Sequence, residues 1–251
     1  HLPGILESIA SAFEKEVPVT IDWSGLEESP SLIWDVRSLL GDELPTAVRS
    51  MSEERRAELV KRVARIQVVT VRDRALRCAR VDDDALTLTI VPGVDRGSFS
   101  WIELEPWLKW EVSGEGQEHF RLPVDHAKEL TLALRTEHGL PLECIELELV
   151  RFTTYGDGLR TQWSLYQLAE LGIDPLGRVL KTLLTEDPEF AQVARERLKL
   201  IVFQPAIDAT QQTVQRVDDV LMLDIHADEG SPGFGGDDAL RALVRAAVVE
   251  G

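Results

Sequence analysis

The feature that most constrains the fold of this chain is an internal repeat whose period is close to half the chain length. The sequence Arg-Val-Asp-Asp at Arg80–Asp83 recurs at Arg216–Asp219, and the apolar run that begins at Leu86 recurs from Leu221. Solenoid repeats have periods of roughly 20–50 residues, so a period as long as this one indicates a duplicated domain. We therefore expect two related units.

The sequence patterns of both halves predict the same order of helices and strands. Periodicities of helix and strand type indicate a helix, a strand, three helices, three strands and a final helix, or α-β-α-α-α-β-β-β-α. This order predicts a tandem α+β fold, each half a small, mostly antiparallel sheet covered by helices. We expect the first repeat over residues 1–112, a polar, glycine-containing linker over 113–123 and the second repeat over 124–251. Pro106 is expected to shorten or break the last helix of the first repeat.

The composition restricts the partners of the chain. Its net charge of −17 opposes binding to nucleic acid and to anionic membranes. One stretch, Arg49–Arg80, is basic and could contact phosphate, but neutralisation by the protein's own acidic side chains explains it more simply. No apolar run is long enough to span a bilayer. With two cysteines and no visible signal peptide, we expect a cytoplasmic protein.

The best candidate for a metal site lies near the end of the second repeat. Asp224, His226 and Asp228 alternate along an expected strand, which would point all three side chains the same way. Carboxylate and imidazole together suit a transition metal. In the alignment of the two apolar runs, the first repeat has Thr89 and Val91 in place of the first two, so such a site would be specific to the second repeat. An exposed strand face with solvated charges is the simpler interpretation.

Two groups of residues are candidates for binding. All tryptophans but Trp163 lie in the first half, and among them Trp107 and Trp110 belong to the helix that Pro106 is expected to interrupt. Large amphipathic aromatic side chains are favoured at interfaces, although core packing is their usual role. In the second half, Tyr155 and Arg160 lie in a glycine-rich loop after the first strand, where duplicated domains often diverge in function.

These observations lead to a functional hypothesis. We expect a non-catalytic protein without a cofactor that binds another macromolecule, most simply a protein. An acidic inhibitor or immunity-type binder of a basic partner is one concrete version, because the chain is strongly acidic. The alternative is a metal-dependent hydrolase in which Asp224, His226 and Asp228 hold a divalent ion that activates water.

Overall fold

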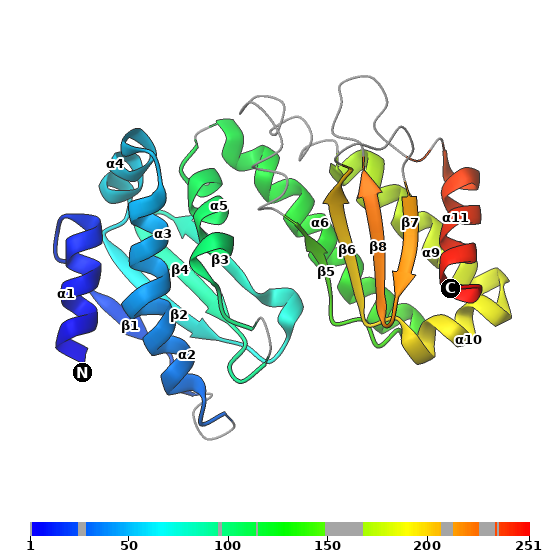
Figure 1. Ribbon diagram of the computed structural model, residues 1–251, viewed down its shortest axis with the longest axis horizontal. Helices are drawn as coiled ribbons and strands as arrows, with labels where there is room; N and C mark the ends of the chain where they lie inside the picture. Colours follow the sequence, from blue (N-terminus) through cyan, green and yellow to red (C-terminus); the bar gives the residue numbers. More distant parts are fainter. Residues whose placement is uncertain are drawn as a thin grey trace. The chain divides into compact units, whose positions relative to one another are not determined.

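The structure consists of two compact units. The computed structural model describes residues 2–24, 29–94, 97–113, 115–148, 168–206, 213–225, 234 and 236–251, and it divides into units His1–Gln117 and Glu118–Gly251 (Figure 1). The boundary between the units lies within the linker expected over 113–123. Most of this segment is helical rather than an irregular loop, because helix α6 begins at Glu115 and runs to His138. Gly116 is the one glycine of this helix, and strong helix formers flank it. Together with the burial of Phe120, they outweigh the turn signals of the stretch.

Each unit contains the expected kinds of element. The first unit holds α1 (Leu2–Phe13), β1 (Val19–Ile21), α2 (Leu32–Ser38), η1 (Leu39–Glu43), α3 (Leu44–Ser50), α4 (Glu53–Arg62), β2 (Arg65–Thr70), η2 (Arg74–Leu76), β3 (Cys78–Asp82), β4 (Ala85–Ile90) and α5 (Trp101–Glu111). The second holds β5 (Cys144–Leu147), η3 (Ala169–Ile173), α9 (Asp174–Glu186), α10 (Pro188–Arg197), β6 (Leu200–Pro205), β7 (Thr213–Val217), β8 (Val220–Ile225) and α11 (Asp237–Val249), and α6 belongs mostly to it. Helix α5 continues through Pro106 rather than breaking there.

The two sheets have the same topology. The strand order is β1-β2-β4-β3 in the first unit and β5-β6-β8-β7 in the second. In each sheet two neighbouring pairs are parallel and only the last is antiparallel, so the prediction of mostly antiparallel sheets is wrong. The connection through η2 carries the chain from the end of β2 to the outer edge, and β4 then returns between β2 and β3. Strand β4 is buried along most of its length, as a central strand requires.

A single shift relates the two sheets. The pairings of β2, β3 and β4 recur in β6, β7 and β8 at one constant offset along the chain. The hairpin turns obey the same offset, because Asp83 (φ 52°) and Asp218 (φ 54°) both adopt a left-handed conformation. The alignment of Arg80–Asp83 with Arg216–Asp219 is therefore out of register by a single position. The short polar side chain of aspartate tolerates this conformation better than most.

Helices cover one face of each sheet. In the first unit, alternate strand residues such as Ile66, Val68, Leu86 and Leu88 are buried in one core with residues of α1, α2, α3 and α5. Figure 1 shows α3 and α5 lying side by side across this face. In the second unit the buried alternate residues include Leu221 and Leu223, and α9 packs against α11.

A proline shapes one helix in each unit. The π-helical segments η1 and η3 each end shortly before a proline, Pro45 in the first unit and Pro175 in the second. Proline lacks an N–H group, so it cannot donate to the carbonyl four residues earlier. In the first unit that carbonyl belongs to Gly41, and it accepts a hydrogen bond from the Ser8 hydroxyl at 3.1 Å. Helix α1 thus supplies the missing donor.

Candidate functional site

Of the expected metal ligands, the structure describes Asp224. Its Oδ1 accepts a hydrogen bond from Gln204 Nε2 at 2.6 Å, and its Oδ2 accepts one from the Thr213 hydroxyl. Gln204 and Thr213 are its partners on the neighbouring strands β6 and β7, so the three side chains form a polar row across the sheet. Both carboxylate oxygens of Asp224 therefore already have protein donors.

The other candidates of the second half lie outside the described residues. These are His226, Asp228, Tyr155 and Arg160. Among the residues that the structure does describe, no group of three or more His, Cys, Asp or Glu side chains is arranged to hold a metal ion. The metal-site hypothesis therefore stays a prediction about residues beyond the end of β8.

The two tryptophans that we expected to bind a partner contribute to packing. Trp110 is only 3% exposed, so it offers a partner almost no surface. Trp107 is partly buried against the core of the first unit, and its ring meets the ring of Phe99 edge to face, with the centroids 6.0 Å apart. We therefore do not include Trp107 and Trp110 in the candidate site.

The basic stretch Arg49–Arg80 makes contacts within its own unit. Arg65 pairs with Asp84 at 3.0 Å, Arg56 pairs with Glu14 at 3.4 Å, and Arg62 donates to the backbone carbonyl of Glu111 at 2.9 Å. These contacts agree with the simpler explanation of the basic stretch, in which its arginines pair with acceptors of the protein itself.

A different set of side chains is exposed to solvent. Nine large hydrophobic residues are exposed among the described residues, and seven of them belong to the first unit. Six of these seven follow β1 or β4 or lie in the first turns of α2 and α5, at the end of the sheet where the parallel strands terminate. We call this set the carboxyl-end surface: it comprises Trp23, Ile33, Trp34, Val94, Trp101 and Ile102. Trp34 is the most exposed of them, at 66%.

The start of α2 is fixed to the loop that follows β4. Asp35 Oδ2 accepts a hydrogen bond from the backbone N–H of Gly93 at 2.9 Å and one from the Ser31 hydroxyl at 3.3 Å. Gly93 has φ +72°, and a Cβ atom there would lie 2.4 Å from Ser29 Oγ. Only glycine fits this close approach, which brings Val94 to the end of the sheet where α2 begins.

The start of α5 is fixed by a capping box and by Arg77. The Ser100 hydroxyl accepts from the Glu103 backbone N–H, and the Glu103 carboxylate accepts from the Ser100 backbone N–H. The Arg77 guanidinium lies 3.3 Å from Glu103 Oε2, donates to the Ser98 carbonyl at 2.7 Å and stacks on the Phe99 ring at 4.0 Å. Glu43 Oε2 accepts from the Trp101 backbone N–H at 2.7 Å. Together these contacts hold the first turn of α5 in place.

The carboxylates of this helix start titrate differently. Burial raises the pKa of Glu103, but the charge of Arg77 and the hydrogen bonds from Ser100 outweigh it, so its pKa lies below the usual value. Burial raises the pKa of Glu105, and attraction to Lys109 offsets this only in part. Glu103 is thus held in its charged form as part of the cap.

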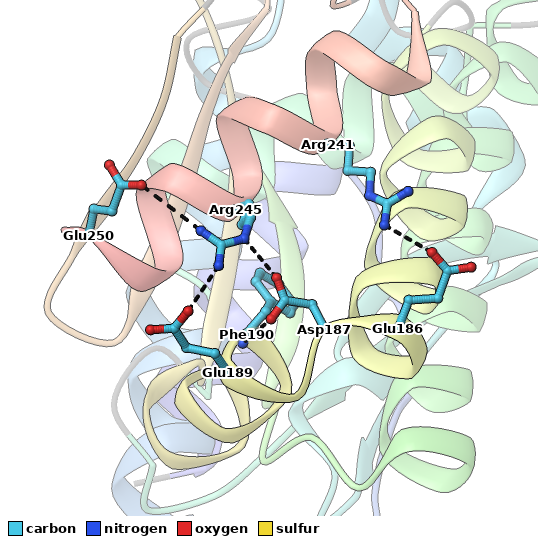
Figure 2. Close-up of polar contacts among 7 residues, drawn as sticks. All are labelled: Glu186, Asp187, Glu189, Phe190, Arg241, Arg245 and Glu250. Atoms are coloured by element: carbon cyan, nitrogen blue, oxygen red, sulfur yellow. Dashed lines mark hydrogen bonds and ion pairs between the residues drawn. The ribbon is translucent and has the colours of Figure 1, made fainter.

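The second unit holds its last helix with charged contacts. Figure 2 shows Arg245 of α11 between Asp187 Oδ2 at 2.7 Å and Glu189 Oε2 at 2.9 Å. Arg241 pairs with Glu186 at 2.9 Å. These side chains connect α11 to the junction of α9 and α10.

The two last helices differ at their first turns. The N-cap of α5 is Ser100 and that of α11 is Gly236, so Trp101 and Ile102 correspond to Asp237 and Asp238. Asp237 is held by two hydrogen bonds from the Arg178 guanidinium, at 2.8 and 2.9 Å. The first unit therefore exposes apolar side chains where its counterpart carries carboxylates.

Comparison with protein-family models, with curated proteins and with solved structures gave no match for this chain. In the part of the chain that the structure describes, no helix has both the length and the apolar character needed to cross a membrane.

Proposed function

We propose that this chain is a non-catalytic binding protein that recognises another protein through the carboxyl-end surface of its first unit. The observation that carries this proposal is the exposure of three tryptophans there: Trp23 at 43%, Trp34 at 66% and Trp101 at 41%. Exposed indoles combine a large apolar area with an N–H donor, and tryptophan is enriched among the residues that dominate binding energy at interfaces.

The internal repeat supplies a control for this argument. A helix with the same place in the fold, α11, begins with Asp237 and Asp238 where α5 begins with Trp101 and Ile102. Apolar residues at this turn are therefore not a requirement of the architecture. Contiguous exposed apolar patches are typical of sites that contact another molecule.

We further propose a cytoplasmic location for this binding protein. Cys78 and Cys144 are not joined in a disulfide. Reduced cysteines are typical of proteins in compartments where thiols are kept reduced. The proposed location also gives the acidic chain access to basic intracellular proteins.

The test is a comparison of captured proteins from the source organism. We would use the unmodified protein, the double variant Trp34→Ser/Trp101→Ser, and the control variant Val217→Ser/Leu243→Ser, which removes two exposed apolar residues of the second unit. The proposal predicts a stoichiometric partner that the first double variant loses and the control retains. Equal capture by all three proteins would contradict the use of this surface.

Metal removal separates this proposal from the hydrolase hypothesis. If the chain is a binding protein without a cofactor, a chelator leaves its unfolding midpoint unchanged. A divalent metal held only by the folded state would raise stability by about 2.7 kcal/mol at a hundredfold excess over its Kd. A metal-dependent rise in Tm that disappears in His226→Ala would favour the hydrolase instead.

A further inference from the structure

The carboxyl-end surface has acidic surroundings. Carboxylates adjoin its apolar residues along the chain: Asp22 precedes Trp23, Asp35 follows Trp34, and Glu103 follows Ile102. Asp42 and Glu43 lie in η1, which follows α2 directly, and Glu105 lies in α5. The only basic residue in the described parts of 22–43 and 97–105 is Arg37, whose guanidinium lies 5.5 Å from the centre of the Trp34 ring.

The β2–β3 connection also reaches this end of the sheet. It contributes Arg72, Asp73, Arg74 and Arg77, of which Arg77 pairs with Glu103. Counting these described residues with those above, and Lys109 beside Glu105, gives seven carboxylates and five basic groups, a net charge of −2. The whole chain carries −17, a net charge of the same sign, which favours long-range attraction of a basic partner.

We propose that the partner of this surface is a basic amphipathic protein segment that inserts apolar side chains between the exposed tryptophans and surrounds them with lysine or arginine. This inference rests on the proposed function and adds the partner's chemistry to it. Apolar anchors supply most of the affinity at such an interface, and complementary charge at its rim speeds association and rejects acidic competitors.

The experiment uses two synthetic amphipathic helical peptides that share their leucine positions. One carries lysine at all polar positions and the other carries glutamate. Binding of each fluorescein-labelled peptide is measured by fluorescence anisotropy with the full chain, with Trp34→Ser/Trp101→Ser and with the control Val217→Ser/Leu243→Ser. Circular dichroism verifies that every variant is folded.

The proposal predicts that the lysine peptide binds, that its Kd rises about tenfold or more in Trp34→Ser/Trp101→Ser and that the control variant binds it as the unmodified protein does. The glutamate peptide should not bind. Equal binding of the lysine peptide to all three proteins would show attraction by net charge alone and overturn the inference.

The remaining outcomes separate the two proposals. If both peptides bind equally and both depend on the tryptophans, the surface still binds protein but the inference of a basic partner fails. If neither peptide binds, the inference fails as well, while the capture experiment decides independently whether the surface binds a protein.

Discussion

Arg77 connects the end of the loop before α5 to the first turn of that helix, which carries part of the carboxyl-end surface. Its guanidinium stacks on Phe99, donates to Ser98 and pairs with Glu103, which caps the helix that begins at Trp101. A planar group with several donors can make all these contacts at once, whereas lysine could not. Arg77 is therefore a positioning residue for the exposed Trp101 and Ile102.

Arg77→Met should loosen this loop. The variant keeps an apolar stem against Phe99 but loses the hydrogen bond to Ser98 and the charge beside Glu103, so we expect a loss of about 1–3 kcal/mol in the free energy of unfolding. The pKa of Glu103 should rise, because burial remains while the favourable charge is gone. Chemical denaturation and an NMR pH titration measure the two effects. Arg37→Met, on the exposed face of α2, is the matched control, and an equal loss there would contradict the assigned role.

Asp83 and Asp218 test the equivalence of the two hairpins. Both have positive φ, which a β-branched residue adopts at a cost of about 1–2 kcal/mol. Asp83→Val and Asp218→Val should each destabilise their own unit by that amount, whereas Asp82→Val, in the extended strand β3, should not. Denaturant unfolding measures all three variants. A much smaller effect at one turn than at the other would show that the duplicated turns are not equivalent.

At the scale of elements, the sequence predicted the kinds of helix and strand but not how the strands are ordered. The repeat and the apolar periodicity indicated four strands in each unit, which the structure confirms. The position of β4 between β2 and β3 depends on pairing between distant residues, which local periodicity does not encode. The π-helical turns before Pro45 and Pro175 were likewise missed, because they depend on which carbonyl the proline leaves without a donor.

The residues of the carboxyl-end surface were not predicted from the sequence to form a binding site. In α2 the buried residues Leu32 and Val36 form a helical stripe that excludes Ile33 and Trp34, so their exposure could have been predicted from spacing. Trp101 was harder, because it lies one helical turn before the buried Leu104 and would share its face. Its exposure follows from its place in the first turn, beyond the reach of the core.

The charged contacts of α11 should make the second unit sensitive to acid. Hydrogen bonds from the Phe190 backbone and from Arg245 lower the pKa of Asp187, and those from Arg178 lower the pKa of Asp237. A carboxyl group whose pKa is lowered by folding stabilises the fold above its unfolded pKa of 3.8 and loses this effect as pH falls through its folded pKa. The midpoint of thermal unfolding should therefore fall between about pH 5 and about pH 3, and more steeply for the unmodified protein than for Arg178→Met/Arg245→Met.

For that measurement, Arg195→Met is the control, because Arg195 donates to a backbone carbonyl, that of His138, rather than to a carboxylate. Identical pH profiles for the unmodified protein and Arg178→Met/Arg245→Met would show that these ion pairs do not contribute to the acid response. Exposed ion pairs are weak individually, so the double variant is needed to make the difference visible.

At the scale of the whole molecule, each unit has its own sheet and buried residues on both sides of the boundary at Gln117 and Glu118. We therefore predict that His1–Gln117 and Glu118–Gly251 fold as separate fragments, each with a cooperative unfolding transition. Circular dichroism and limited proteolysis of the two fragments check this. A fragment that lacks a cooperative transition would show that its stability depends on the rest of the chain.

The proposed roles of the two units follow from their differences. Both carry the same sheet topology, but the first exposes tryptophans where its sheet ends, while the second places carboxylates at the start of its last helix. In a duplicated fold, features that both copies share serve the architecture, and features of one copy point to function. We therefore propose that the first unit, rather than the second, binds the partner.

Site-specific photo-crosslinking in the source organism would show whether the first unit binds a partner protein. A photoreactive amino acid would replace Trp34 in one protein and Val217, which is exposed in the second unit, in another. Our account predicts a discrete covalent adduct with one other protein from position 34 and none from position 217. Adducts from position 217 alone, or the same adducts from both positions, would contradict it.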